Sequence, residues 1–222
     1  MLQRPVHLLI ALTMLLLSGA GSAGAQQNRG ADVSAGERAD IDRINTYLNQ
    51  LGRMRADFMQ IAPDGSVSRG DFYLNRPGRM RFEYAPPDQI LIVADGVWVA
   101  VQEDKALPIQ RYPIGSTPLS PILEKQVSLG EKKEVIAVER QKGLLKLRLR
   151  DPEAPEKGEL TLIFTDAGQQ AGASGIELRQ WVVVDAQGLM TQVGLSNIQE
   201  AERLDPKLFI LNDPAPGSQH RR

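Results

Sequence analysis

The feature that most constrains the fold is a change in the spacing of apolar residues at Met54. Before this point Ile41, Ile44, Leu48 and Leu51 recur every three or four residues, a spacing that places them on one face of a helix of about 15 residues. After it, apolar residues alternate with polar ones or form short runs between turn signals, as in β-strands. No series of helical patterns alternates with these strands, so we expect an antiparallel sheet rather than parallel β-α-β units.

Short signals mark the ends of the helical segments. Ser34 and Glu37 have the spacing of a capping box, which predicts the start of the long helix, and Gly52 is expected to stop it. A proline-punctuated apolar stretch later interrupts the strand pattern. There Thr117 can cap a helix and Pro118 can occupy its first position, which predicts a short helical segment over residues 118–125.

About eleven short strands account for the alternating pattern. Asp95 and Gly96 have the composition of a two-residue hairpin turn, and residues 63–65 and 185–188 carry further turn signals. These signals predict a mainly β fold with one antiparallel, meander-like sheet. The predicted strands cover residues 54–61, 70–76, 79–84, 89–94, 97–102, 109–112, 135–139, 144–150, 160–164, 176–184 and 190–197.

The first 25 residues have the features of a cleavable signal peptide. Arg4 and His7 precede an apolar run over residues 8–17. Residues 23–25 (AGA) then have the small-residue pattern of a cleavage site. The apolar run of about ten residues is too short for a membrane-spanning helix, which needs roughly 20. We therefore expect cleavage after Ala25 and export of the remaining chain.

The mature chain, residues 26–222, has the length of one domain, and we place its core at residues 34–211. Loss of Arg4 leaves 25 basic against 27 acidic residues, so no basic excess points to nucleic acid. The chain has no cysteine, so it does not depend on disulfides and lacks the residue that carries a lipid anchor. We expect a free periplasmic protein.

Enzyme chemistry has few candidate residues in the mature chain. Its one histidine is His220, in the polar tail, which argues against a Ser-His-Asp triad, a Cys-His pair or an ordinary zinc site in the core. Carboxylate-only catalysis needs a facing pair of acids, but Asp71 and Glu83 have the parity of the polar face and Asp95 lies in a turn. We therefore expect no enzyme activity, no cofactor and no metal.

One predicted strand pair carries the candidate binding face. Between residues 70 and 84, large apolar side chains occupy even positions and charged ones occupy odd positions, with Tyr73 as the aromatic exception. Successive side chains of a strand point to opposite faces, so one face is apolar and the other is solvated. The apolar members are Phe72, Leu74, Met80, Phe82 and Tyr84.

Arg76 is the anomaly, because it shares the parity of the apolar face. A guanidinium buried there costs free energy unless its donors are satisfied. Alternatively, Pro77 and Gly78 bend the chain and turn Arg76 into water. Parity alone leaves both orientations open.

Two predicted strands are apolar on both sides, at residues 90–93 and 97–101. This pattern indicates strands that are covered on both faces. An ordinary two-sided core would explain it. So would the long helix on one face and a ligand or the short helix on the other.

Seven short motifs follow one another along the chain: residues 58–60 (FMQ), 70–77 (GDFYLNRP), 81–84 (RFEY), 86–87 (PP), 92–96 (IVADG), 117–118 (TP) and 204–209 (LDPKLF). In this order, and behind a signal peptide without a lipid-anchoring cysteine, they resemble the periplasmic outer-membrane lipoprotein carrier family, LolA. The resemblance extends from the first helix to Phe209 and is densest over residues 58–118.

The resemblance implies an unclosed antiparallel half-barrel of about eleven strands, with a long N-terminal helix and short lid helices over its concave face. It also implies a monomeric carrier that takes acylated lipoproteins from an inner-membrane ABC transporter to an outer-membrane receptor. In the family, the arginine of the Arg-Pro motif points into the cavity and bonds the lid. That residue corresponds to Arg76. Met80 departs from the family, whose members often carry a bulkier aromatic there.

The ligand-binding residues that this resemblance and the parity imply are Phe72, Leu74, Arg76, Met80, Phe82, Tyr84, Ile90, Ile92, Leu119, Ile122 and Leu123. On this hypothesis Arg76 is a latch that stabilises the closed, empty state and so makes holding reversible. Two other functions stay compatible with the sequence. One is a periplasmic carrier or sensor of another lipid on the same fold, and the other is a structural interaction protein with an unoccupied core.

Overall fold

A computed structural model describes residues 33–104, 107–131, 134–168 and 175–211. The predicted signal peptide, residues 1–25, and the polar tail, residues 212–222, lie outside the described residues. No helix in these four described ranges is both long enough and apolar enough to cross a bilayer.

The described chain forms eleven strands in one sheet, together with two α-helices and three short 3₁₀ helices. The strands are β1 (Arg53–Ile61), β2 (Val67–Asn75), β3 (Arg79–Tyr84), β4 (Leu91–Asp95), β5 (Trp98–Gln102), β6 (Gln110–Pro113), β7 (Glu134–Gln141), β8 (Leu144–Arg150), β9 (Glu159–Asp166), β10 (Ile176–Val184) and β11 (Met190–Glu200). The helices are α1 (Ala35–Gln50), η1 (Ile114–Ser116), α2 (Ser120–Leu123), η2 (Pro155–Lys157) and η3 (Pro206–Phe209).

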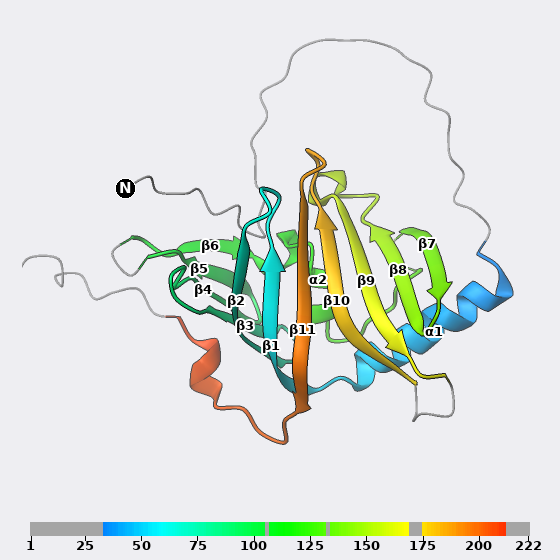
Figure 1. The fold of residues 1–222 in the computed structure, drawn as a ribbon, viewed down its shortest axis with the longest axis horizontal. Helices are drawn as coiled ribbons and strands as arrows, with labels where there is room; N and C mark the ends of the chain where they lie inside the picture. The colour runs from blue at the N-terminus through cyan, green and yellow to red at the C-terminus, as the bar shows by residue number, and fades with distance from the viewer. Residues whose placement is uncertain (1–32, 105–106, 132–133, 169–174, 212–222) are drawn as a thin grey trace, which may run out of the picture.

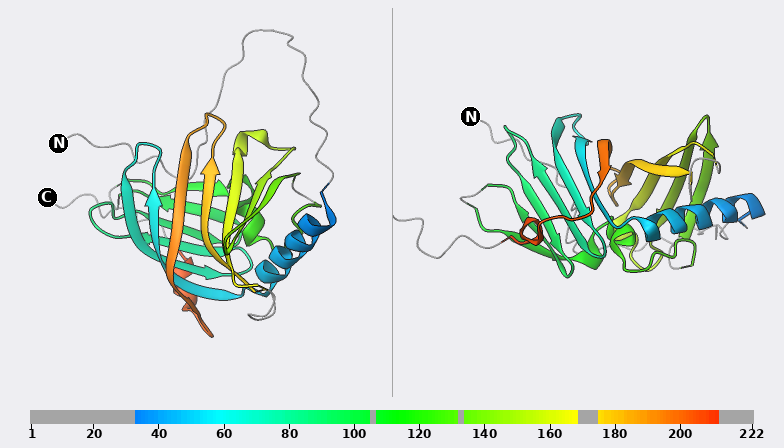
Figure 2. Two further views of the ribbon diagram at one scale, coloured as in Figure 1. Left: turned by 45° about the vertical axis from the view of Figure 1, so that its right-hand side comes forward. Right: turned by 90° about the horizontal axis from the view of Figure 1, so that it is seen from below.

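The strand order is β6-β5-β4-β3-β2-β1-β11-β10-β9-β8-β7, and every pair is antiparallel. Two meanders are therefore joined where β1 pairs with β11, and the sheet curves into an open trough (Figure 1, Figure 2). Its edges, β6 and β7, do not pair, although they follow one another in the chain. The prediction of an unclosed antiparallel half-barrel is confirmed.

Helix α1 begins as the sequence predicts. The Glu37 amide donates to Ser34 Oγ at 3.3 Å, and the Ser34 amide donates to a Glu37 carboxylate oxygen at 2.8 Å. Ile44 and Leu48 are fully buried in the helix face that packs near β10 and β7. The helix ends two residues before Gly52, with Leu51 as an extended cap.

The second helical segment is shorter than predicted. Helix α2 has a single turn that starts at Ser120, with Pro121 in its first turn and Leu119 as the cap residue. The prediction that Thr117 caps this helix is wrong, because the Thr117 hydroxyl donates backward to the Ile114 carbonyl at 2.9 Å. That bond belongs to η1 (residues 114–116), and of the predicted segment 118–125 only residues 120–123 are helical.

Both faces of β4 are covered, as its composition predicts, whereas β5 leaves Trp98 44% exposed on its convex side. Val93 pairs with Arg81 and so lies on the convex face, where Arg81 Nη1 donates to the Leu208 carbonyl at 3.0 Å. Phe209 of η3 is buried on the same side of β3 and β4. The alternative in which the long helix covers this face is wrong, since the C-terminal segment covers it and α1 lies against the other half of the sheet (Figure 1).

Candidate functional site

The concave face brings the sequence-predicted apolar residues together. Alternation along β1, β2 and β3 turns one side chain in two toward this face, and these positions are buried. All ten predicted apolar site residues belong to one cluster, and each is at most 4% exposed. They are Phe72, Leu74, Met80, Phe82, Tyr84, Ile90, Ile92, Leu119, Ile122 and Leu123.

Aromatic rings form the centre of this cluster. Phe82 lies edge-on to Phe58 at 5.1 Å between ring centroids, and Phe72 lies 4.7 Å from Phe82. Gly70 makes room for this packing: a Cβ there would lie 2.8 Å from the Phe58 ring and 2.0 Å from the Glu83 carbonyl oxygen. The wall is therefore assembled from large rings that pack closely around a glycine.

A neutral polar pair is buried in the same face. The Tyr84 hydroxyl donates to Gln60 Oε1 at 2.8 Å, and Gln60 is 1% exposed. Burial raises the pKa of Tyr84, so the phenol stays protonated and acts as a donor. Gln60 is absent from the predicted site residues, although its even position in β1 has the same parity as Phe58.

Arg76 lies just past the end of β2 and reaches two other segments. Its Nη2 donates to the Glu124 carbonyl at 2.5 Å, and its Nη1 donates to the Leu51 carbonyl at 3.4 Å. Burial lowers the pKa of the guanidinium. Within the described residues its hydrogen-bond partners are carbonyl oxygens and no carboxylate pairs with it. The structure therefore places Arg76 between the end of α1 and the end of α2, rather than in a solvated turn.

The connection from η1 through residue 129, called the lid below, is fastened at a second point. Two asparagines of α1, one turn apart, each bond an amide and a carbonyl of the lid. Asn49 bonds both backbone groups of Val127 at 2.8 Å, and Asn45 bonds those of Leu129 at 2.9 and 3.2 Å. The side-chain amides of these two asparagines therefore hold the backbone of the last lid residues against α1.

The interior beneath the lid is nearly filled. A void of about 20 Å³ lies between β3, β4, β5 and the lid, lined by Met80, Phe82, Ile92, Val99, Thr117, Pro118 and Leu119. That is space for about one water molecule. Leu119, Ile122 and Leu123 of the lid belong to the apolar cluster of the concave face, and we call this arrangement closed.

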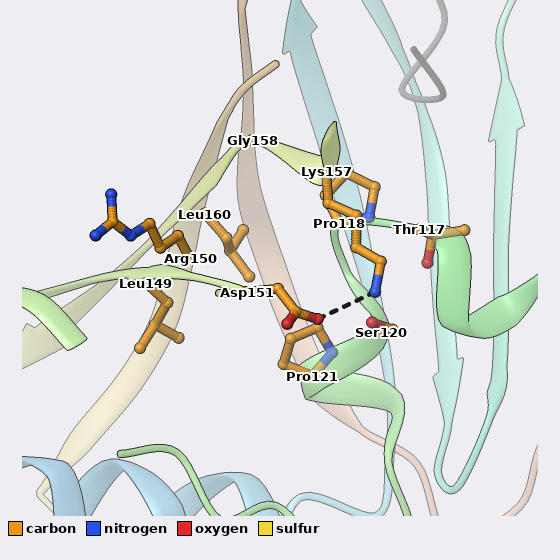
Figure 3. Close-up of a pocket in the computed structure, with 10 residues that line it drawn as sticks. All are labelled: Thr117, Pro118, Ser120, Pro121, Leu149, Arg150, Asp151, Lys157, Gly158 and Leu160. Carbon is orange, nitrogen blue, oxygen red and sulfur yellow. Dashed lines mark hydrogen bonds and ion pairs between the residues drawn. The ribbon is translucent and has the colours of Figure 1, made fainter. Parts of the chain in front are cut away.

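Two further hollows flank the lid. One, of about 20 Å³, separates the lid from the β8–β9 connection, where Lys157 Nζ lies 3.1 Å from an Asp151 carboxylate oxygen (Figure 3). The other is an open cleft of about 610 Å³ at the β2–β3 and β4–β5 turns, with Arg79, Asp95 and Lys125 in its wall. In the part of the chain that the structure describes, no cluster of His, Cys, Asp or Glu side chains could hold a metal ion.

Trp181 is a concave residue that the sequence pattern hides. It is 0% exposed, and its ring lies 5.8 Å from Phe72 and 6.1 Å from Phe82. A bulge between Leu178 and Gln180 shifts the pairing of β10 with β9, so the inward positions change from even to odd along one strand. A parity argument carried through β10 would have placed Trp181 outside.

An open antiparallel half-barrel, with an apolar concave face closed by a lid, defines the structural class of this protein. Within that class, the chain belongs to the family of the outer membrane lipoprotein carrier protein LolA, whose model matches residues 49–212. No curated protein sequence matches the chain.

Solved structures with similar folds are distant in sequence. A LolA superfamily protein from Nitrosomonas europaea has 11% identity, a TM-score of 0.44 and coverage of 78% of this chain and 97% of its own. A DUF1329 family protein from Desulfovibrio piger has 12% identity and a TM-score of 0.45, with 78% and 96% covered. LprF from Mycobacterium bovis has 15% identity and a TM-score of 0.38, with 76% and 97% covered.

Proposed function

We propose that this chain is a non-enzymatic periplasmic carrier that holds the acyl anchor of lipoproteins on its concave face. The observation that supports this proposal most is the contact between the concave face and the lid. There Arg76, which has no carboxylate partner among the described residues, bonds a lid whose own apolar side chains fill the space that a ligand would take. The family supports a lipoprotein carrier in general, and the transfer between membranes is our extension of it.

The size of the cargo explains why the interior has to be apolar. Three acyl chains contain on the order of 45 methylenes, and their exposure to water would cost roughly 35 kcal/mol at about 0.8 kcal/mol each. The closed interior has a void of about 20 Å³, so cargo cannot enter without moving the lid. In this proposal, acyl chains replace Leu119, Ile122 and Leu123 against the concave wall, which Met80 and the aromatic rings allow to adapt.

Release is the second requirement of a carrier. When the lid moves, Arg76 loses its bond to the Glu124 carbonyl and a buried charge is left with an unsatisfied donor, which is costly. This cost is recovered when the ligand leaves and the lid closes. Arg76 thus lowers the affinity for cargo and favours hand-over.

The proposal also assigns a route. Residues 1–25 direct export and are removed after Ala25, and the mature chain acts as a monomer. It accepts acylated lipoproteins from an inner-membrane ABC transporter and delivers them to an outer-membrane receptor. No nucleic acid, metal or cofactor takes part.

Release from spheroplasts tests this function. Purified residues 26–222 are added to spheroplasts of a Gram-negative bacterium that synthesise a labelled lipoprotein, and we expect a soluble complex of the two proteins in the supernatant. The same cargo without its acylated cysteine should stay unbound. If no complex forms, native mass spectrometry of the periplasmic protein separates the alternatives: another lipid bound in the interior would favour a different carrier or sensor, and no lipid would favour a structural protein.

A further inference from the structure

Two hydrogen-bond donors in the interior have no acceptor. Among the buried side-chain nitrogen and oxygen atoms of the described residues, Arg76 Nε and Trp181 Nε1 lack a partner. Both are N–H groups, which can only donate. Both unpaired groups are donors, so a ligand could satisfy them only with hydrogen-bond acceptors.

The surroundings of Trp181 explain why its donor is unused. Its cross-strand neighbours are Leu162 on β9 and Val193 on β11, and its ring packs against Phe72 and Phe82. These side chains carry no oxygen or nitrogen acceptor. A buried donor without an acceptor destabilises the protein, and such groups in native structures call for a specific explanation.

Phe82 links Trp181 to the ligand space. The same ring contacts Trp181 and lines the void under the lid at Thr117 and Pro118. Lid residues cover Phe82 in the closed arrangement, so a ligand that replaces them would lie against Phe82, next to the indole ring.

We propose that Trp181 Nε1 binds a carbonyl oxygen of the ligand, and that the interior selects acyl esters and amides over hydrocarbon of equal length. The inference rests on the proposed carrier function and adds to it the polar group that is recognised. Acyl esters and amides bring carbonyl acceptors into an apolar site, whereas an ether-linked chain brings no carbonyl. Trp181 then recognises the acyl linkage, while the aromatic wall binds the methylenes.

A single-tryptophan protein allows this contact to be measured directly. The chain has two tryptophans, and Trp98 is 44% exposed on the other face of its strand, so Trp98→Phe leaves Trp181 as the reporter. The probes are dipalmitoylglycerol and its diether analogue dihexadecylglycerol. We expect the diester to shift Trp181 emission to longer wavelength, as a new hydrogen bond to the indole does, and the diether to leave it unshifted.

Affinity gives the second measurement. In the Trp98→Phe protein we expect the diester to bind about fivefold more tightly than the diether. Adding Trp181→Phe, which keeps an aromatic ring and removes the N–H, should abolish this preference and leave the affinity for the diether nearly unchanged.

Each outcome decides a different question. A diester preference that survives Trp181→Phe, or equal binding and no emission shift with Trp181 present, overturns the role of Trp181 and leaves the carrier function standing. Failure of both lipids to bind contradicts the carrier function, and the inference with it. The emission shift is measured with Trp181 in place, so it decides the question even if the Trp181→Phe protein does not fold.

Discussion

Arg76 satisfies its terminal donors with carbonyl oxygens of Leu51 and Glu124 instead of a carboxylate. A hydrogen bond from a charged donor contributes about 1.5–3 kcal/mol, whereas a partly buried carboxylate partner would hold the guanidinium more tightly and would itself lose solvation. Of these two carbonyl groups, only that of Glu124 belongs to the lid, so Arg76 holds the lid through one hydrogen bond of modest strength. A bulky apolar ligand, whose burial contributes more, can displace it.

Replacing Arg76 with leucine should leave uptake of cargo intact and impair its release. Leucine adds apolar surface at the lid and removes the bonds that favour the closed, empty state, so acyl chains are held more tightly. We expect transfer from a purified cargo complex to receptor-bearing membranes to slow by about tenfold or more. Arg69→Leu, at an exposed position of the preceding strand β2, should transfer at the wild-type rate. Normal transfer by Arg76→Leu would remove Arg76 from the mechanism.

Gly70 is a residue where packing leaves no room for a side chain. An alanine Cβ would lie 2.0 Å from the Glu83 carbonyl oxygen and 2.8 Å from the Phe58 ring, so β2, β3 or the ring has to shift. We expect Gly70→Ala to lower the free energy of unfolding by about 2–4 kcal/mol, as measured by urea denaturation. Gly194→Ala in β11, where nothing lies within 4 Å of the added Cβ, is the matched control and should change stability by less than about 1 kcal/mol.

At the scale of elements, α1 acts as a clamp between the sheet and the lid. Near its middle it is tied to the sheet through Arg43, whose Nη2 lies 2.8 Å from Asp166 of β9, and through Asp40, which pairs with Arg140 of β7. Its second half holds the lid through Asn45 and Asn49. Val127 and Leu129 are therefore held on α1, and under the proposed function we expect the lid to pivot before Val127.

Asn49→Ala should loosen this clamp. It leaves the amide and carbonyl of Val127 without their partner, and an unsatisfied backbone group that stays partly buried costs about 1–3 kcal/mol. We expect faster hydrogen exchange at the Val127 amide and a loss of about 1–2 kcal/mol in unfolding free energy. Thr46→Ala, an exposed position of the same helix, is the control and should leave that amide protected. Unchanged exchange at Val127 would show that the asparagine does not hold the lid.

At the scale of the whole molecule, the sheet has a core on each side. The lid and α1 cover the concave face, and η3 covers β3 and β4 on the convex face. This outer cover lets β4 be apolar on both sides, since Val93 on its convex side is 1% exposed. The half-barrel wall is therefore stiffened from outside at the strands that bear much of the candidate binding face.

Phe209→Ala should reveal how much the outer cover contributes. Phe209 is 2% exposed, and truncation of a buried phenylalanine costs about 3–5 kcal/mol, so we expect a loss of that size in thermal or urea unfolding. Ile210→Ala alters the next residue, which is 55% exposed, and should change stability by less than about 0.5 kcal/mol. Equal effects of the two substitutions would contradict the role of Phe209 as an anchor.

Local patterns in the sequence were sufficient to predict most of the strands and the apolar residues that β2 and β3 place on the concave face. Alternation places Phe72, Leu74 and Phe82 together because β2 and β3 are regular, and Asp95–Gly96 forms the expected turn, with Gly96 at a φ of 111°. One misplaced strand boundary has a local cause: Gln89 has a left-handed φ of 50°, so β4 begins at Leu91 and not at residue 89.

Other features depend on contacts that no local pattern encodes. Trp181 faces inward because of a bulge, which shifts parity without a signal in the composition. The burial of Phe209 on β3 and β4 joins segments far apart in the chain, and no periodicity relates them. The interior position of Arg76 follows from carbonyl oxygens that α1 and the lid bring to it, so parity alone left its orientation open.

The pairing of β1 with β11 also has a consequence for the order of folding. Within each half of the sheet, strands pair with their neighbours in sequence, whereas this seam joins residues such as Asp57 and Asn197, which are 140 positions apart. Closing so long a loop costs more entropy than forming a hairpin, so we expect the two halves to assemble before they join. Leu195→Ala at the seam should then speed unfolding and leave the refolding rate nearly unchanged, as stopped-flow kinetics would measure. Slower refolding would place the seam in the nucleus instead. Under the proposed export, β1 to β6 would form a complete meander while the strands of the second half are still crossing the membrane.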